Sequence, residues 1–172
     1  MNSVRISSGI YRGRKIATPG SGTHPMGERE RLALFNMLAD DLPGAVALDA
    51  YAGSGVLGIE ALSRGAARVV FVEKDYGAAK VIKENLESLD LSEEVLVDNV
   101  KTFTTDEKFD LILVDPPYDK FEIEGAVNLV QFLKNGGVLV LSHPGEAPEI
   151  PGVEMVKSRS YAGATISIYR KA

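Results

Sequence analysis

A carboxylate, two prolines and an aromatic ring follow one another at Asp115-Pro116-Pro117-Tyr118. They come directly after a short apolar run, residues 109–114, which is typical of a buried parallel strand. Each proline lacks an amide donor, so the strand is expected to end here. Ligands of open α/β sheets bind at the carboxyl ends of the strands. A hydrogen-bond acceptor beside an aromatic ring at that edge indicates a site for a flat heterocycle with an exocyclic amino group.

A glycine-rich segment, residues 48–58, carries the second group of candidate residues. Gly53, Gly55 and Gly58 have the spacing of a nucleotide-binding loop between an expected strand and an expected helix. Glu73, about 20 residues after Gly53, ends the next expected strand and can accept hydrogen bonds from a ribose diol. This spacing fits NAD, FAD or S-adenosylmethionine (SAM).

Asp49 discriminates between these cofactors. A dinucleotide places its pyrophosphate on the loop and the helix N-terminus, where a carboxylate at the strand end would repel it. SAM brings an ammonium and a sulfonium instead, and a carboxylate attracts both. The spacing Asp49-x-x-x-Gly53-x-Gly55 also resembles motif I of methyltransferases. We therefore expect SAM, and the residues expected to bind it are Asp49, Ala52, Gly53, Ser54, Gly55, Leu57, Glu73, Lys74, Asn99 and Asp115.

The adenine of the cofactor is expected against the turn that follows the third strand of the sheet, residues 97–100. Either Asp98 or Asn99 could contact the adenine amine, and the register favours Asn99. An Asp-Asn pair also forms turns without any ligand, and this alternative is nearly as good. Asp75 has a structural alternative too, as the cap of the helix that is expected to start there.

From residue 45 onward, strand patterns alternate with helix patterns, which predicts a parallel sheet with helices on both faces. Strands are expected at residues 45–49, 68–73, 94–97, 109–114 and 137–141, helices at 27–40, 55–64, 75–89 and 121–133, and a final hairpin at 153–160 and 165–170. We therefore expect one α/β domain over residues 1–172. Its doubly wound, seven-stranded, mostly parallel sheet is the arrangement of class I methyltransferases, with the SAM-binding core at 26–172.

The N-terminal segment, residues 1–25, is expected to form a small hairpin and a loop, with extended pieces at 4–7 and 14–17. Between residues 5 and 15 it carries four cations and no acid; the cations are Arg5, Arg12, Arg14 and Lys15. The net charge of the chain is −5, which is unusual for a protein that binds RNA, because phosphate contacts supply much of that affinity. The distribution of charge matters more than its sum, so a basic arm that binds RNA and an ordinary solvated hairpin both fit.

The composition excludes several kinds of site. There are no cysteines, so disulfides and thiolate metal sites are impossible. The two histidines, His24 and His143, are far apart, and each precedes a proline, as loop residues often do. No metal is expected. No apolar run approaches the roughly 18 residues of a membrane span, and the N-terminus has no apolar signal core. These features favour a soluble, cytoplasmic protein, which we expect to be a monomer.

Several longer stretches carry a resemblance to a known family. They are Arg5-Ile6-x-x-Gly9-x-Tyr11-Arg12-Gly13-Arg14-Lys15, Leu34-Phe35-Asn36, residues 48–66 and Asp115-Pro116-Pro117-Tyr118. In these the chain resembles, nearly end to end, the bacterial 16S rRNA (guanine(966)-N(2))-methyltransferase family. The resemblance implies SAM as the cofactor, transfer of a methyl group to the exocyclic N2 of a guanine, and ribosomal RNA or the small-subunit particle as the partner.

The resemblance also implies roles for the four residues of the proline turn. The amino group of guanine is a poor nucleophile because its lone pair is delocalised into the ring. Asp115 and the Pro116 carbonyl are expected to accept its hydrogens, and Pro117 helps to fix these acceptors in place. Tyr118 is expected to stack on the base. No strong base is required, because the nitrogen becomes acidic once it is methylated.

The chain departs from this family just before the first expected helix. The family usually has Arg-Pro-Thr, a small polar residue and Asp-Arg, whereas this chain has His24-Pro25-Met26-Gly27-Glu28-Arg29. Asp-Pro-Pro-Tyr also occurs in adenine-N6 methyltransferases, so an enzyme that acts on adenine N6 or another exocyclic amine of RNA or DNA is the alternative. A non-catalytic module with the SAM fold and a dinucleotide oxidoreductase are further alternatives.

Overall fold

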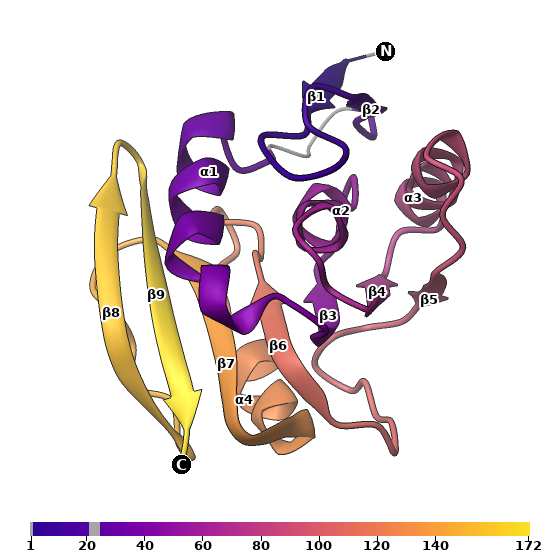
Figure 1. The fold of residues 1–172 in the computed structure, drawn as a ribbon. Helices are drawn as coiled ribbons and strands as arrows, with labels where there is room; N and C mark the ends of the chain where they lie inside the picture. The colour runs from indigo at the N-terminus through magenta and orange to yellow at the C-terminus, as the bar shows by residue number, and fades with distance from the viewer. Residues whose placement is uncertain (1, 21–24) are drawn as a thin grey trace.

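The computed structural model describes residues 2–20 and 25–172, which fold around one seven-stranded sheet (Figure 1). Its strands are β3 (Val46–Ala50), β4 (Arg68–Glu73), β5 (Glu94–Val97), β6 (Phe109–Val114), β7 (Leu133–His143), β8 (Val153–Tyr161) and β9 (Ala164–Lys171). Their order in the sheet is β5-β4-β3-β6-β7-β9-β8. The first five strands in this order pair in parallel, and β9 is antiparallel to both of its neighbours. The predicted α/β sheet with a closing hairpin is confirmed.

Helices cover both faces of the sheet. The helices α1 (Glu28–Met37), α2 (Val56–Ser63) and α3 (Tyr76–Ser88) lie on one face, and α4 (Glu124–Leu129) lies on the other (Figure 1). Short 3-10 turns, η1 (Ala39–Asp41) and η2 (Val130–Phe132), follow α1 and α4. Side chains alternate along a strand, so β6 contributes to a hydrophobic core on each face of the sheet. Leu111 and Leu113 pack in the core under α1, α2 and α3, whereas Ile112 and Val114 pack in the core under α4. Among the described residues, no helix is both long and apolar enough to span a bilayer.

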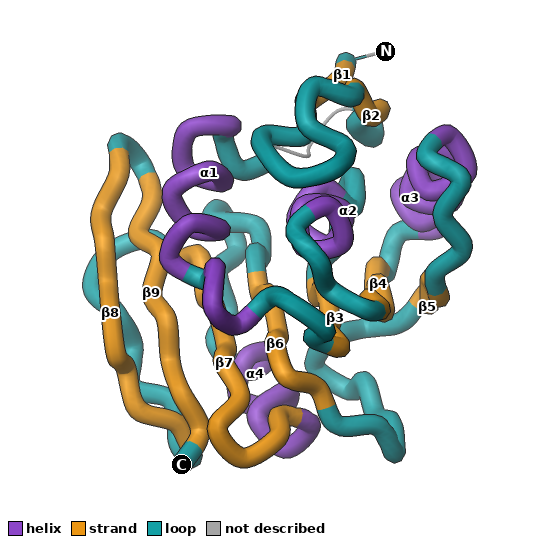
Figure 2. The backbone as a smooth tube through the Cα atoms, in the orientation of Figure 1, coloured by secondary structure: helices purple, strands orange, loops and turns teal. Residues whose placement is uncertain are grey.

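The segment before and within β7 differs from the prediction. The sequence predicts a helix at 121–133, but α4 is shorter and the strand already begins at Leu133. Phe109 pairs with Leu133, and Leu111 then pairs with Val138, so β7 bulges between these pairs. Gly136, with φ 77°, supplies the left-handed backbone that the bulge requires. Teal loops in Figure 2 show how the strands connect to the elements around them.

The N-terminal segment forms a separate antiparallel hairpin of β1 (Ser3–Arg5) and β2 (Lys15–Ala17), which lies over α2 (Figure 1). We call residues 2–20 the N-terminal arm. Its turn is fixed to the end of α2, because the Ile10 amide donates to the Ser63 carbonyl at 2.9 Å and Ser63 Oγ donates to the Ser8 carbonyl at 2.6 Å. A Cβ on Gly9 (φ 84°) would lie 2.1 Å from the Ser63 carbonyl oxygen, so only glycine permits this approach.

A buried ion pair joins the arm to the body of the protein. Arg31 on α1 and Glu60 on α2 have side chains that are 2% and 0% exposed, and Arg31 Nε donates to Glu60 Oε2 at 3.1 Å. The same guanidinium donates to the carbonyls of Arg5, at 2.6 Å, and Met26. Glu60 Oε2 also accepts from the Ser7 amide at 3.0 Å. The pair therefore links the arm, the start of α1 and the middle of α2.

We predict that Arg31→Met lowers the free energy of unfolding by about 3–5 kcal/mol, because Glu60 would be left charged and buried without its partner. The double variant with Glu60→Leu should recover part of this loss, because no buried charge remains. Urea unfolding followed by circular dichroism measures both values. The control is Arg29→Met, an exposed position on the same helix. An Arg31→Met loss no larger than that of the control would contradict the assignment.

Candidate functional site

Three carboxylates meet at the carboxyl ends of three neighbouring strands. Asp49 lies near the end of β3, Glu73 ends β4, and Asp115 directly follows β6. Burial raises the pKa of Asp49 well above its ordinary range, and the charges of Asp115 and Glu73 raise it further, although a hydrogen bond from the Gly58 amide opposes the shift. Among the described residues, no salt bridge involves any of these three carboxylates. In the part of the chain that the structure describes, this edge of the sheet therefore carries three carboxyl groups without an ion-pair partner.

The proline turn follows β6 as predicted, and a serine from β7 organises it. Burial raises the pKa of Asp115 to about 6, and a hydrogen bond with the Ser142 hydroxyl opposes this shift. The same hydroxyl bonds the Tyr118 hydroxyl. Ser142 is 2% exposed and was not identified from the sequence, because one serine in an apolar strand gives no sign of its partners. It fixes the carboxylate and the aromatic ring relative to each other, across Pro116 and Pro117.

The glycine loop is held from two sides. The amide of Gly53 donates to Glu73 Oε1 at 2.9 Å, which ties the loop to the end of β4. The side chain of Asn85 on α3 donates to the Ser54 carbonyl at 2.9 Å. Gly53 and Gly55 have φ angles of 58° and 84°, which explains the need for glycine at both positions. The loop is thus held by hydrogen bonds from β4 on one side and from α3 on the other.

The third glycine of the motif has a packing role. A Cβ on Gly58 would lie 2.3 Å from the ring of Phe71 on the neighbouring strand. The Gly58 amide donates to Asp49 Oδ2 at 2.9 Å. Asp49 is 1% exposed, so one of its oxygens supports the first turn of α2. Its predicted contact with the cofactor stays a prediction.

The other residues predicted to bind the cofactor lie in different environments. Ala52 and Leu57 are buried beside the glycine loop, whereas Lys74 is exposed after β4. Asp75 accepts a hydrogen bond from the Ala78 amide at 2.8 Å, so its structural alternative, the cap of α3, is confirmed. The expected contacts of Ala52, Leu57 and Lys74 with the cofactor stay predictions.

The turn expected to hold the adenine is formed by its own side chains. Asn99 Oδ1 accepts from the Lys101 amide at 2.9 Å, and Asp98 Oδ1 accepts from the Asn99 amide at 2.7 Å. Both side chains belong to exposed residues, so each retains groups that could face a ligand. Their contact with adenine stays a prediction.

Tyr51 is another residue of this edge that the sequence did not reveal. Its φ of 55° is rare for a residue other than glycine, and such strain is often kept at functional sites. Burial raises the pKa of its hydroxyl, and the charge of Glu124 raises it further. A Cβ on Gly125 would lie 2.0 Å from that hydroxyl, so the tyrosine side chain occupies the space against α4. The position of an aromatic residue directly before the glycine loop could have identified Tyr51 as a candidate from the sequence.

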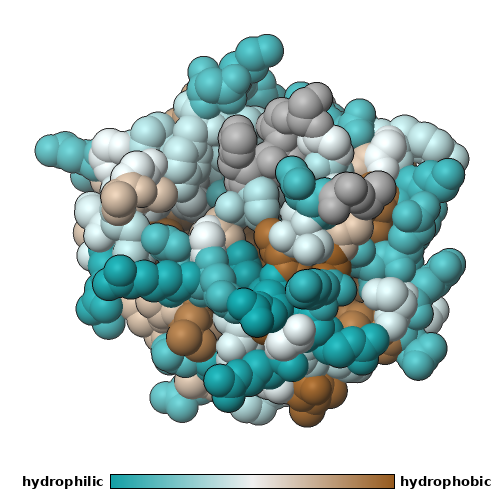
Figure 3. Space-filling view, turned by 90° about the horizontal axis from the view of Figure 1, so that it is seen from above, coloured by the Kyte–Doolittle hydropathy of each residue, from teal (hydrophilic) through white to brown (hydrophobic). Residues whose placement is uncertain are grey.

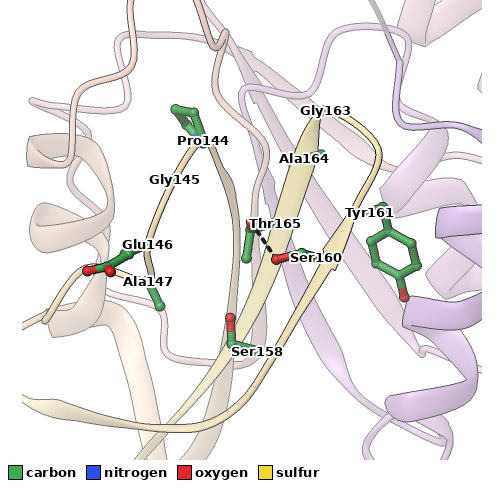
Figure 4. Close-up of a pocket in the computed structure, with 10 residues that line it drawn as sticks. All are labelled: Pro144, Gly145, Glu146, Ala147, Ser158, Ser160, Tyr161, Gly163, Ala164 and Thr165. Atoms are coloured by element: carbon green, nitrogen blue, oxygen red, sulfur yellow. Dashed lines mark hydrogen bonds between the residues drawn. The ribbon is translucent and has the colours of Figure 1, made fainter.

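His143 belongs to a polar cluster at the end of β7. It is 0% exposed, and its Nε2 lies 2.7 Å from the Ser167 hydroxyl, which in turn lies 2.9 Å from the Ser158 hydroxyl. The hydroxyls of Ser160 and Thr165 pair at 3.2 Å. Figure 4 shows three of these hydroxyl-bearing side chains in an open hollow beside the loop that follows His143. The histidine therefore has a structural role.

No metal site emerges from the part of the chain that the structure describes. Within it, no three side chains of His, Asp or Glu are grouped so that they could hold an ion. His24 lies outside the described residues. The carboxylates of the sheet edge are therefore not arranged as a metal centre.

The cations of the arm lie away from the proline turn. Arg14 donates to the Ser88 carbonyl at 2.9 Å, at the end of α3 that is opposite to Glu73. Arg12 and Lys15 are exposed beside it. Seen from above, this side of the molecule is largely hydrophilic, with hydrophobic patches between (Figure 3). The role of these cations in RNA binding stays a prediction.

Asp115→Asn is expected to raise the free energy of unfolding at pH 8 and to leave it nearly unchanged at pH 4. The folded carboxyl, with a pKa of about 6, holds its proton more tightly than a carboxyl at the ordinary value of 3.8. Wild-type stability therefore falls as the pH rises between these values and levels off above them. Asparagine does not ionise, so a gap of about 1–3 kcal/mol should open over this window. Partial exposure of Asp115 favours the lower end.

Urea unfolding at several pH values measures this gap. Asp119→Asn, an exposed carboxylate in the same loop, is the matched control and should show little effect. A difference between Asp115→Asn and the wild type that does not change with pH would contradict a raised pKa at this position.

Comparison with known proteins places the chain in a family. The family model described as Conserved hypothetical protein 95 matches residues 4–170. A Bacillus subtilis (strain 168) protein, provisionally named an rRNA methyltransferase, is 34% identical over 98% of this chain and 99% of its own length. Ribosomal RNA small subunit methyltransferase D of Haemophilus influenzae is 38% identical over 74% of this chain and 70% of its own length.

The fold is shared with solved structures as well. A structure from Escherichia coli, provisionally named a methyltransferase, superposes with a TM-score of 0.90 at 30% identity and covers 99% of this chain and 98% of that one. Both the sequence and the architecture therefore match from end to end. The chain belongs to the Conserved hypothetical protein 95 family.

Proposed function

We propose that this protein is a SAM-dependent methyltransferase that transfers a methyl group to the exocyclic N2 of a guanine in small-subunit (16S) ribosomal RNA. Membership of the family and the names of its relatives as small-subunit rRNA methyltransferases support the reaction and the substrate. The observation that carries the proposal is the position of the unneutralised carboxylates beside the proline turn. Together they offer a place for a cation and a place for an amine.

The carboxylate cluster fits SAM better than it fits a dinucleotide. A pyrophosphate at the glycine loop would face the carboxylates Asp49, Glu73 and Asp115; burial, and then the charges of the other two, already raise the pKa of Asp49. A sulfonium and an ammonium would instead be attracted to the same charges. Glu73 accepts one hydrogen bond from the Gly53 amide on Oε1 and one from the Asp75 amide on Oε2. Each of these carboxylate oxygens has a further lone pair that can accept a hydrogen bond from a ribose hydroxyl.

The proline turn supplies the groups that act on the target. SAM, when bound, supplies an electrophilic methyl group on sulfur. Asp115 accepts one hydrogen of the guanine amine and the Pro116 carbonyl accepts the other, which localises the nitrogen lone pair. With a pKa of about 6, Asp115 is mostly ionised at neutral pH and is a strong acceptor. Tyr118, anchored through its hydroxyl to Ser142, presents its ring to the base.

The catalytic prediction is that Asp115→Ala lowers turnover about a hundredfold or more and changes SAM affinity much less, because this side chain faces the amine. The assay incubates the protein with SAM and small subunits from a strain that lacks the gene, and mass spectrometry of the nucleosides identifies the product. Asp119→Ala is the control. N2-methylguanosine supports the proposal, N6-methyladenosine would favour the alternative substrate, and a rate within about threefold of wild type would remove Asp115 from the mechanism.

The second prediction concerns RNA binding by the arm. Neutralising Arg12, Arg14 and Lys15 together, each to Gln, should weaken RNA binding and flatten its salt dependence by about three phosphate contacts. Without RNA, SAM affinity should not change, because no hydrogen bond of these three side chains among the described residues reaches the glycine loop or Glu73. Filter binding over a range of salt concentrations provides the slope.

A matched control removes the same charge elsewhere. Lys108, Lys134 and Lys171, each changed to Gln, lie near the amino end of β6, at the start of β7 and at the end of β9. This triple variant should keep the wild-type slope. If both triple variants behave alike, the arm is a solvated hairpin and RNA is held by other residues.

A further inference from the structure

Asn85 on α3 binds both the arm and the glycine loop. Its Oδ1 accepts from the Ala17 amide at 2.9 Å, and its Nδ2 donates to the Ala17 carbonyl and to the Ser54 carbonyl, each at 2.9 Å. The residue is 3% exposed. One acceptor and two donors are thus engaged by two segments that are distant in sequence, which uses both donors of the amide.

On the arm side, Asn85 takes the place of a neighbouring strand. Ala17 ends β2, and both polar groups of its backbone bond to this one side chain. The adjoining amide of Thr18 turns the other way and donates to the Asn2 carbonyl at 2.9 Å. The outer edge of the hairpin is therefore hydrogen-bonded to α3. A shift of β2 would move or break the two hydrogen bonds between Ala17 and the Asn85 side chain.

On the loop side, Asn85 reaches the backbone that starts α2. Ser54 is 2% exposed, and its hydroxyl accepts from the Val56 amide at 3.2 Å. A Cβ on Gly55 would lie 3.2 Å from Ile82, one turn before Asn85 on α3, so the loop already rests closely on this helix. Movement of the Asn85 amide group would consequently displace the loop that is proposed to hold the cofactor.

The other attachments of the arm end elsewhere. The turn of the arm bonds Ser63 at the far end of α2, and Arg31 bonds Glu60 in its middle. Neither of these contacts reaches the glycine loop at residues 52–55. Among the hydrogen bonds of the described residues, Asn85 is the side chain that joins the arm directly to that loop.

We propose that Asn85 is a positioning residue that couples RNA bound on the arm to the conformation of the SAM loop. The inference rests on the proposed function. RNA that orders the arm fixes Ala17, Ala17 fixes the amide of Asn85, and that amide fixes the Ser54 carbonyl. Coupling of this kind is reciprocal, so a bound cofactor also strengthens the attachment of the arm.

The test measures affinity for S-adenosylhomocysteine, the demethylated product of SAM, so that no turnover occurs. Calorimetry is run with and without small-subunit rRNA transcribed in vitro. In the wild type, the RNA should tighten binding about fivefold or more. In Asn85→Ala, the ratio of the affinities for S-adenosylhomocysteine with and without RNA should fall to within about twofold. The same is expected of Asn85→Asp, whose side chain keeps an acceptor but loses both donors. Ser88→Ala removes a hydrogen bond to the Asn85 backbone carbonyl only and should keep the wild-type factor.

The outcomes separate the inference from the function on which it rests. A wild-type factor that persists in Asn85→Ala and Asn85→Asp overturns the inference and leaves the function intact, and so does a wild type whose affinity does not respond to RNA. A wild type that does not bind S-adenosylhomocysteine overturns both.

A second measurement needs no variant, in case the substitutions prevent folding. Hydrogen exchange of the wild-type protein should slow at the Ala17 amide when S-adenosylhomocysteine is added, because the ligand fixes the loop and therefore Asn85. The Ile10 amide, which bonds Ser63, is the internal control and should not change. Equal effects at the two amides, or none at Ala17, would show that Asn85 has a purely structural role.

Discussion

Burial of Asp49 beside two further carboxylates is the constraint on which the rest of the site depends. The strand order β4-β3-β6 brings the ends of these strands together and therefore brings Glu73, Asp49 and Asp115 together. Burial and the two neighbouring charges raise the proton affinity of Asp49, so the folded chain alone bears a free-energy cost at this edge. A cation that binds here would lower this electrostatic cost, and the free energy recovered would contribute to its binding affinity. The same charges make the edge a poor place for a pyrophosphate.

Hydrogen bonds from the surrounding elements hold the three carboxylates in place. The amide of Gly53 in the glycine loop donates to Glu73, and the amide of Gly58 in α2 donates to Asp49, so the backbone fixes two of the three carboxylates. The third is fixed by Ser142 from β7. Preorganised acceptors of this kind stabilise developing positive charge without rearranging during the reaction. The site therefore depends on hydrogen bonds between segments as much as on its motifs.

How much could be predicted from the sequence depended on whether a feature is local. Short apolar runs marked three strands with their observed bounds, at 68–73, 94–97 and 109–114, and contiguous motifs marked the glycine loop and the proline turn. The start of β7 was missed because its bulge depends on pairing with β6. Ser142 and Asn85 were missed because the partners of both side chains lie far along the chain.

The position of the arm limits what it can contribute to recognition. Its turn is fixed at the end of α2, and the glycine loop lies at the start of that helix. Eight helical residues separate them, a rise of about 12 Å. One target nucleotide cannot contact both the turn of the arm and the glycine loop, so Arg12 in that turn would bind a phosphate of another nucleotide. Phosphate contacts position a nucleic acid, whereas contacts to base edges specify it. Under the proposed function, the choice of the methylated atom would therefore belong to the proline turn, and the arm would contribute affinity and register.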